Sequence, residues 1–226
     1  MGYRYVRYAL NYKKVNYRTE WTDLLDIETL RKSLNAGANR KHPNDGTDFY
    51  TLPLIIDHTN NHKVVGDSFE IAVYLDSIDK SNDNKLIPDG TRGLQKALNL
   101  YADAVFTPLA SLFVIPFNPA TEAEVKQNWA KRWSVANLDD LKLEGEKRVE
   151  HLQKCKAAVS NFAKCYQEVK PGPFLHGHTL TYADFVVGGW LQCIKRTVPE
   201  WQEVMQWDDG IWADLLHALE PYTAEQ

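Results

Sequence analysis

The spacing of apolar residues changes once along this chain of 226 residues, near the turn-forming sequence Pro88-Asp89-Gly90. Before this turn, short strand-like runs are mixed with the wider apolar spacing of helices. After it, the apolar repeats have the spacing of amphipathic helices, and no further strand is expected. The sequence therefore predicts a small mixed α/β domain over residues 1–80, followed by an all-helical domain over residues 91–226.

The first eighty residues are expected to hold two helices, a hairpin and a third helix. The predicted elements before the third helix are a helix over 6–13, a strand over 16–21, a helix over 27–34 capped by Asp26, a polar loop over 40–48, and a hairpin of strands 52–56 and 63–65. The third helix begins at Asp67 or Ser68. Its apolar side chains are expected to face a core: Phe69, Ile71, Ala72 and Leu75.

The helical half is expected to contain five helices. They cover residues 91–114 with a kink at Pro108, a shorter stretch that opens at a capping box over 121–124, and then residues 139–169, 185–196 and 210–219. The helix over 185–196 is preceded by Thr181-Tyr182-Ala183-Asp184, whose first and last residues form a second capping box.

Composition limits the class of protein. Hydrophobic residues make up 44% of the chain, with 7 Trp, 11 Tyr and 8 Phe, which is enough for a folded core. The net charge of −4 and the scattered signs argue against binding nucleic acid. No apolar run is long enough to cross a membrane. The three cysteines lack metal-binding spacing, and the pair His176 and His178 has no third ligand nearby, so we expect free thiols, no metal and a cytoplasmic location.

Pro53 interrupts the apolar run TLPLIID. A proline has no backbone N–H, so within a strand it indicates a sheet edge, a bulge or a cis peptide bond. A cis bond would leave the backbone of Leu52 free to pair with a peptide-like ligand. A simple edge-strand proline is an equally good interpretation of this residue alone.

Asp67 and Ser68 stand where the third helix begins. The N-terminus of a helix has free N–H groups and a favourable dipole for anions, so a carboxylate could bind Ser68 while Asp67 binds an ammonium group. An ordinary helix cap is the alternative. Together with the proline, the pair describes a site for the backbone and charged end of an α-amino acid.

These motifs, TLPLIID and VVGDSFEIAVYLD, resemble the glutathione-binding half of the glutathione S-transferases, and the helical half fits the same family. The resemblance spans nearly the whole chain and implies a thioredoxin-like N-terminal domain followed by an all-α C-terminal domain. The stretches NYRTEW, DIETLRKSL and YTLPLI are similar to the fungal and bacterial β-etherase-like branch.

The resemblance also implies roles for individual residues. Leu52 and Pro53 would bind the cysteinyl backbone of glutathione, and Asp67 and Ser68 would bind its γ-glutamyl end. Lys41 and His42 lie in a loop that often contacts the glycyl carboxylate, although they could equally be solvated. Thr181 and Asp184 match the family's capping box, which is a folding element.

The family's first strand, and the loop whose Ser, Cys or Tyr stabilises the glutathione thiolate, have no counterpart before the sequence MGYRYVRYALNYKK. Catalysis requires a group that lowers the thiol pKa from about 8.5 toward neutrality. Tyr3 and Tyr5 are weak candidates for it, because aromatic residues at a helix start more often serve packing.

The second substrate would lie between the domains, against the first long helix of the helical half. Candidate lining residues, most of which we expect in the core with some lining an apolar cavity, are Tyr101, Val105, Phe106, Leu109, Phe113 and Trp190. We expect either detoxification-type conjugation of glutathione or aryl-ether cleavage. The alternatives are a non-catalytic ligandin that holds glutathione or aromatic molecules, and an inactive truncated scaffold. As in the family, a homodimer would form through residues 68–79 and 91–114.

Overall fold

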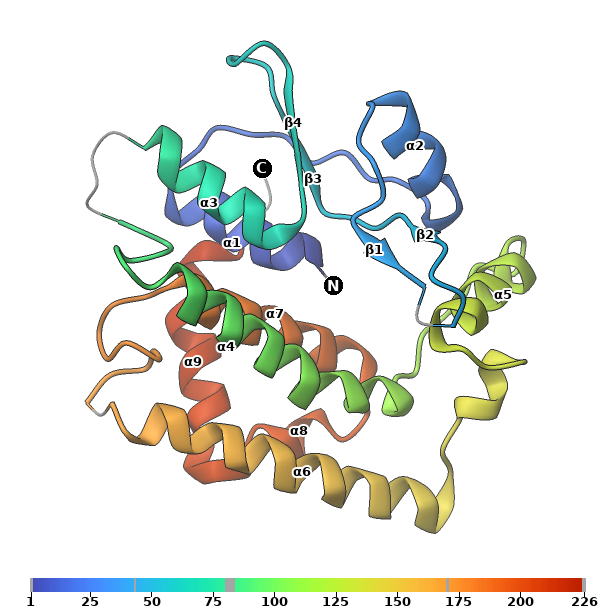
Figure 1. The fold of residues 1–226 in the computed structure, drawn as a ribbon. Coiled ribbons are helices and arrows are strands. Elements are labelled where there is room, and N and C mark those ends of the chain that lie inside the picture. The colour runs from blue at the N-terminus through green and yellow to red at the C-terminus, as the bar shows by residue number, and fades with distance from the viewer. Residues whose placement is uncertain (1, 43, 80–83, 170, 225–226) are drawn as a thin grey trace.

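A computed structural model describes residues 2–42, 44–79, 84–169 and 171–224, with the side chains of residues 2–4 excluded. Figure 1 shows two layers: a smaller one with all the strands of the described residues, and a larger one built of helices. The fold is a thioredoxin-like N-terminal domain with short sheets, joined to a helical C-terminal domain. This confirms the predicted fold class.

The N-terminal domain combines three helices with two short hairpins. Its elements are α1 (Gly2–Tyr12), α2 (Ile27–Ser33), β1 (Arg40–Lys41), β2 (Asp48–Phe49), β3 (Leu54–Asp57), β4 (Lys63–Gly66) and α3 (Ser68–Ile78). Strand β1 pairs with β2, and β3 pairs with β4, both antiparallel. In the second pair Leu54 lies opposite Gly66 and Asp57 opposite Lys63, which confirms the predicted hairpin.

Two local predictions in this domain are wrong. Residues 16–21 form an irregular segment, because their alternating pattern has no neighbouring strand to pair with among the described residues. The loop over 40–48 contains the β1–β2 hairpin. Asp26 is the N-cap residue of α2, as predicted, although its side chain makes no cap hydrogen bond; the side chain of Asp23, which accepts from the Leu25 N–H, caps the preceding turn Leu24–Asp26.

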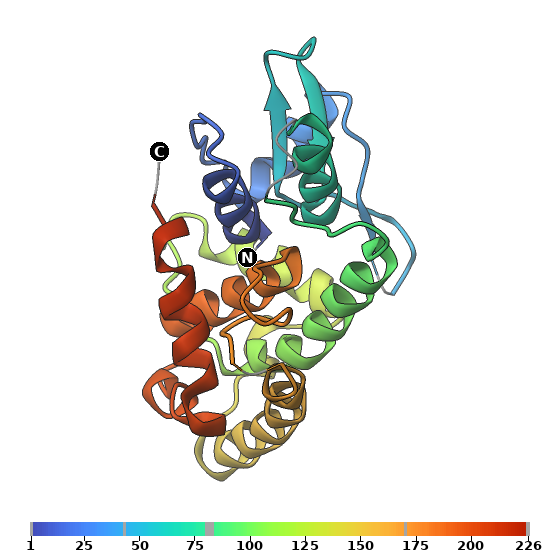
Figure 2. The ribbon, with the colours of Figure 1, turned by 90° about the vertical axis from the view of Figure 1, so that its left-hand side faces the viewer.

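The C-terminal domain consists of helices. They are α4 (Arg92–Phe106), α5 (Glu122–Trp133), α6 (Gly145–Gln167), α7 (Tyr182–Thr197), α8 (Trp201–Val204) and α9 (Ile211–Leu219), with short 3-10 turns between several of them. Figure 2 shows α9 and the described end of the chain returning toward α1. There the Asn11 side chain donates to the carbonyls of Tyr222 and Ala224.

Several helix boundaries differ from the predictions. The segment over 91–114 does not kink at Pro108; the α-helix ends at Phe106 and continues as a 3-10 helix over Thr107–Leu112. The box at Thr121 does not form, since its side chain makes no cap hydrogen bond. Helix α6 begins at Gly145, whose φ of +54° is outside the helical region. The pattern does not predict α8.

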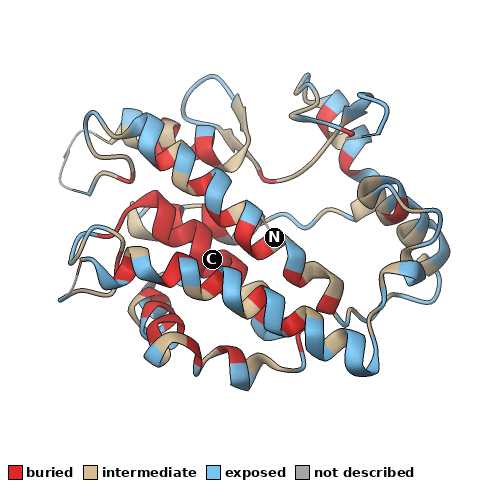
Figure 3. Ribbon diagram, turned by 60° about the horizontal axis from the view of Figure 1, so that its bottom comes forward, coloured by how far each residue is buried: buried red, intermediate tan, exposed pale blue. Residues whose placement is uncertain are grey.

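The core centres on α7, which is buried along most of its length (Figure 3). Helix α1 lies between α3 and α7 and so joins the two domains. Glycine allows this close approach: a Cβ at Gly189 would lie 1.9 Å from the ring of Tyr5, and one at Gly188 would meet Leu219. Lys13, only 2% exposed, adds ion pairs from α1 to Asp76 and Asp79 near the end of α3.

Candidate functional site

The strand-like segment before β3 leaves part of its backbone unpaired. The Leu52–Pro53 peptide bond is cis, which is one of the three arrangements expected from the sequence. Pro53 is buried. Neither the N–H nor the carbonyl of Leu52 forms a backbone hydrogen bond within the described residues. The main chain at Leu52 is therefore available to a peptide-like partner.

The N-terminus of α3 follows β4 directly. Asp67 is the cap: its Oδ1 accepts the Phe69 N–H at 3.0 Å, with the backbone at a φ of +77°. Ser68 is the first helical residue and is only partly buried. Its hydroxyl lies 3.0 Å from the Tyr182 hydroxyl. The two predicted roles thus fall on different residues. Asp67 caps the helix, whereas the Ser68 hydroxyl takes no part in the cap.

Arg31, which the sequence analysis did not identify, packs close to the chain just before the start of α3. Its buried guanidinium donates to the carbonyls of Gly37 and Thr51 at 2.8 and 2.9 Å. A Cβ at Gly66 would lie 2.8 Å from its Nη2, so glycine is required for this approach. Burial lowers the pKa of Arg31, while the negative charge of Asp67 acts in the opposite direction. Arg31 therefore links the loop after α2 to Thr51, the residue directly before Leu52.

A hydrogen-bond network carries Ser68 into the helical domain. The Tyr182 hydroxyl, at the start of α7, bonds to the Ser68 hydroxyl and lies 3.2 Å from the amide oxygen of Asn99. The amide nitrogen of Asn99 donates to Asp103 at 3.2 Å, and the Trp190 indole N–H donates to the same carboxylate at 2.9 Å. We call these five residues the interdomain network. The Ser68 hydroxyl is therefore bound by a side chain of the helical domain and not only by contacts within α3.

The electrostatics of the interdomain network follow from its burial. Burial is the main cause that raises the pKa of Asp103, with the Trp190 hydrogen bond and the charges of Arg40 and Lys96 opposing the shift. Burial also raises the pKa of Tyr182, so its hydroxyl stays protonated at neutral pH. A protonated Tyr182 can act as a hydrogen-bond donor at any pH near neutrality.

The two candidates for thiolate stabilisation are placed differently. The side chain of Tyr3 lies outside the described residues. Tyr5 is buried against Gly189, and its hydroxyl pKa is raised well above its usual range, first by burial and then by the charge of Asp103. The packing role that was weighed for Tyr5 is therefore present in the structure.

The two candidates for the glycyl carboxylate lie on the β1–β2 hairpin. Lys41 is exposed, and its Nζ pairs with Asp48, its cross-strand neighbour, at 2.5 Å. His42 is buried and packs on Phe49 with a ring-centroid distance of 4.5 Å. Its Nδ1 has no hydrogen-bond partner among the described residues. Lys41 is thus already neutralised, whereas His42 keeps an unused polar atom.

The apolar candidates lie mainly in the core, as was expected for most of them. Phe106 and Leu109 are fully buried and Val105 is 7% exposed. Phe106 stacks on Trp190 at 6.2 Å, while Tyr101 packs on Phe162 and is 38% exposed. Phe113 is partly buried. Neither of two shallow hollows, about 400 Å³ beside Trp201 and about 360 Å³ beside Asn11, includes any of these residues.

The capping box at the start of α7 is formed by Thr181 and Asp184. Asp184 is fully buried and accepts hydrogen bonds from the Leu175 and Thr181 N–H groups, the Thr181 hydroxyl and, at 3.4 Å, the Tyr166 hydroxyl. Burial raises its pKa to about 6, against these hydrogen bonds. All its contacts lie within the protein, as expected for a folding element.

The described residues contain no group of His, Cys, Asp and Glu side chains that could hold a metal ion. His176 and His178 lie in the segment before α7, where backbone bridges link residues 174–179. Within the described ranges, no helix is both long and apolar enough to span a bilayer.

Comparison with known proteins gives consistent results along the chain. Residues 3–78 match the model for the glutathione S-transferase N-terminal domain, and residues 94–222 match that for the C-terminal domain. The glutathione S-transferase-like protein ustS of Aspergillus flavus is 29% identical, over 94% of this chain and 80% of that protein.

Two fungal crystal structures are similar over nearly the whole chain. A glutathione S-transferase of Ceriporiopsis subvermispora, solved in complex with glutathione, is 29% identical, with a TM-score of 0.86 over 98% of this chain and 90% of that one. A glutathione transferase of Phanerochaete chrysosporium is 28% identical, with a TM-score of 0.85 over 99% of this chain and 90% of that one.

Proposed function

Because this chain belongs to the glutathione S-transferase family, we propose that it binds glutathione at the α3 N-terminus and joins glutathione through its sulfur to a hydrophobic or aromatic electrophile. One observation carries the proposal: Asp67 and Ser68 lie at a helix start that directly follows β4, the strand paired with β3, and the unpaired backbone of Leu52 precedes β3. That combination suits the main chain and charged end of a peptide.

The chemistry of glutathione fits these groups one by one. The carboxylate of its γ-glutamyl end would accept hydrogen bonds from the Ser68 hydroxyl and from N–H groups at the helix start. Its ammonium would pair with Asp67, since only Oδ1 of that carboxylate is used as the helix cap. Its cysteinyl backbone would pair with Leu52. The sulfur would then lie between the domains.

In the proposed reaction the thiol loses its proton and the thiolate attacks an electrophilic carbon. A C–S bond forms, and the bond to the leaving group breaks with its electron pair. An ether carbon as the electrophile would correspond to the β-etherase-like branch. Rate would come from proximity and from a hydrogen bond that stabilises the thiolate, for which Tyr3 and Tyr5 stay the candidates.

A non-catalytic glutathione or aromatic-ligand binder is the second candidate function. It is favoured by the burial of Tyr5, whose hydroxyl bears a raised pKa and whose ring is packed on α7. A hydroxyl in that position is held by the protein core.

Ultraviolet difference spectroscopy of bound glutathione, combined with an activated aryl halide assay, separates these functions. A thiolate band near neutral pH together with conjugate formation would support the enzyme. Saturable binding without a thiolate band would support the binder. A folded protein that does not bind glutathione would contradict both and leave the inactive scaffold.

We also propose a homodimer through α3 and α4. Large apolar side chains are exposed on these helices: Ile78 at 42%, Leu94 at 60%, Leu100 at 61% and Tyr101 at 38%. Large apolar side chains left exposed on both of these helices would be covered by contact with a second copy of the chain. Sedimentation of the chain should give a dimer, and Leu94→Glu with Leu100→Glu should give a monomer. A monomeric native chain would contradict the proposal.

The division into domains over residues 1–80 and 91–226, like the cytoplasmic location, stays a prediction. Limited proteolysis would test the division, which expects cleavage within residues 81–90 and two protected fragments. Cleavage elsewhere first would contradict it.

A further inference from the structure

One face of the β1–β2 hairpin gathers positive charge around an aromatic ring. Arg40 and Phe49 are directly opposite each other in the antiparallel pair, so their side chains lie on the same face. His42, two residues after Arg40, shares that face and packs on Phe49 at 4.5 Å. Lys41 lies between them and therefore points to the other face, where Asp48 neutralises it.

Helix α5 of the helical domain adds a second arginine to this face. The Arg132 guanidinium lies 5.3 Å from the centre of the Phe49 ring. Figure 1 shows the C-terminal part of α5 beside the hairpin. Burial lowers the pKa of Arg132, and the positive charge of Arg40 lowers it further. The two guanidinium groups therefore repel each other across a partly desolvated space.

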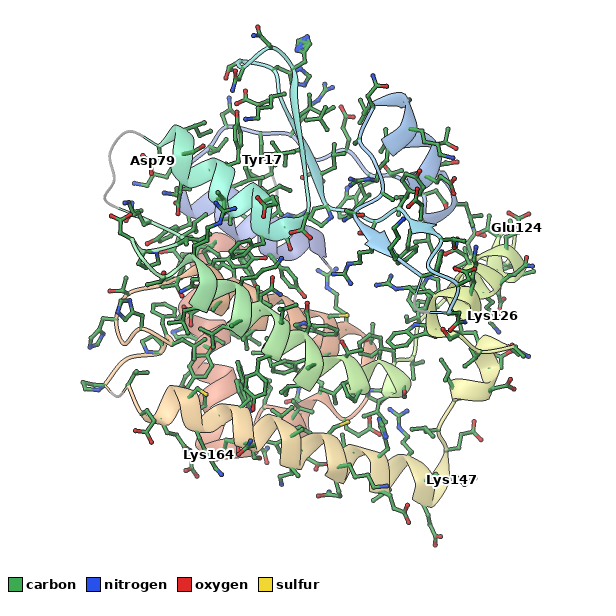
Figure 4. All side chains as sticks on the ribbon, viewed as in Figure 1. Tyr17, Asp79, Glu124, Lys126, Lys147 and Lys164 are labelled. Atoms are coloured by element: carbon green, nitrogen blue, oxygen red, sulfur yellow. The ribbon has the colours of Figure 1, made fainter. Side chains whose placement is uncertain are left out.

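Neither arginine has an acidic partner in the part of the chain that the structure describes. Among those residues, no carboxylate lies within ion-pair distance of Arg40 or Arg132. Lys126, on the same helix α5 and labelled in Figure 4, is paired with both Glu122 and Asp139 at 3.0 Å. His42 adds a buried Nδ1 that lacks a hydrogen-bond partner within the described ranges. Among the described residues, Lys41 and Lys126 near this face are thus paired with carboxylates, whereas the two arginines are not.

We propose that Arg40, His42, Phe49 and Arg132 bind the carboxylate of a planar aromatic acid, which would be the second substrate or ligand. This rests on the proposed function, since it assigns a substrate class to the same interdomain site. A guanidinium binds a carboxylate through two parallel hydrogen bonds, and the partly exposed Phe49 ring, which lies close to both Arg132 and the tilted His42 ring, suits a flat aromatic ligand. The charge of Arg40 also acts on the pKa values of Tyr5, Asp103 and Tyr182, which places it toward the interdomain network.

The test compares binding of naphthoate and of its uncharged carboxamide, with and without glutathione. We expect the native chain to prefer naphthoate, and Arg132→Gln and Arg40→Gln each to reduce this preference about tenfold, the loss of a charge-assisted hydrogen bond. Lys131→Gln is the matched control on the same helix and should keep it. Arg132→Lys, which keeps the charge, covers the case in which Arg132→Gln does not fold.

Equal preference in all variants would overturn the proposal. A second outcome would also overturn it. In that outcome the arginine variants bind naphthoate like the native chain but lose the preference for glutathione over glutathione amidated at its glycine. The carboxylate bound by the arginines would then be the glycyl carboxylate of glutathione. If the native chain failed to bind glutathione but discriminated naphthoate in the predicted way, the aromatic-acid site would stand and the proposed transferase function would fail.

Discussion

Two helix N-termini in this molecule carry similar residues in different surroundings. Helix α7 begins with Thr181 and Asp184, and α3 begins with Asp67 and Ser68, so each offers a hydroxyl and a carboxylate. Asp184 is fully buried, and four donors of the protein bond to it. At α3, Ser68 is partly exposed, and one oxygen of Asp67 makes the cap bond.

The difference shows how a cap and a binding site can be built from the same chemistry. A helix start whose polar groups are all satisfied inside the protein stabilises the fold and has nothing left to offer a ligand. A helix start that keeps a hydroxyl and a carboxylate oxygen accessible can bind a charged amino-acid group. Tyr182 links the two, because it is the first residue of α7 and its hydroxyl bonds to Ser68.

The largest expected effect is on protein stability, at the start of α7, where the polar groups are satisfied inside the protein. Asp184→Ala would leave the buried N–H groups of Leu175 and Thr181 without an acceptor, so the free energy of unfolding should fall by about 3–5 kcal/mol. Glu124→Ala is the matched control, because it removes the acid of the box at Thr121 that does not form. Chemical denaturation should show almost no loss for Glu124→Ala. Equal losses in both variants would remove the contrast between the two boxes.

The second effect concerns pH. Burial raises the pKa of Asp184 to about 6 from 3.8, so between these values the folded state holds a proton that the unfolded state releases. The stability of the native chain, measured relative to Asp184→Asn, should therefore be highest below about pH 4 and fall as the pH rises through 6. The expected fall is about 3 kcal/mol, because raising a pKa by one corresponds to about 1.4 kcal/mol. A relative stability that rises with pH over this range would contradict the burial of the charged carboxylate.

A smaller effect should test whether Tyr182 links the starts of α3 and α7. Tyr182→Phe removes the hydroxyl that joins Ser68 to Asn99, so we expect a loss of about 1–2 kcal/mol in stability together with weaker glutathione binding. Tyr74→Phe is the control, because its hydroxyl donates to Asp57 instead. It should lose stability while glutathione affinity stays unchanged. If both variants bind glutathione like the native chain, the interdomain network does not position Ser68.

Much of the fold could be predicted because the signals are local. The hairpin around Thr59, the start of α3 and the capping box of α7 each depend on residues within a few positions of one another. The alternating pattern of residues 16–21 predicted a strand that does not form. A strand needs a neighbouring strand to pair with, and no local pattern reveals whether one is present. Thr121 and Glu124 have the sequence spacing of a capping box, but the box does not form, and the spacing alone does not reveal this.

The surroundings of the site could not be predicted in this way. The partners of Tyr182 in the interdomain network, Ser68 and Asn99, are 114 and 83 positions away along the chain. Arg31 has the sequence context of a surface residue on an amphipathic helix, and only the tertiary structure places its guanidinium against Gly66. Likewise, the apolar repeat over α4 and the 3-10 helix after it does not tell a core face from a ligand-lining face, so the pattern alone cannot distinguish buried Phe106 and Leu109 from exposed Tyr101.

The most direct test of the central claim is a calorimetric titration of the 226-residue chain with glutathione, using Ser68→Ala and Ser77→Ala. Ser77 lies on the same helix, exposed, and bonds only to the Tyr74 carbonyl among the described residues. We predict saturable binding that Ser68→Ala weakens by on the order of 1–3 kcal/mol, the value of a charge-assisted hydrogen bond. Ser77→Ala should bind like the native chain. Equal affinity in all three proteins would contradict the claim, since the α3 N-terminus would then serve only as a helix cap.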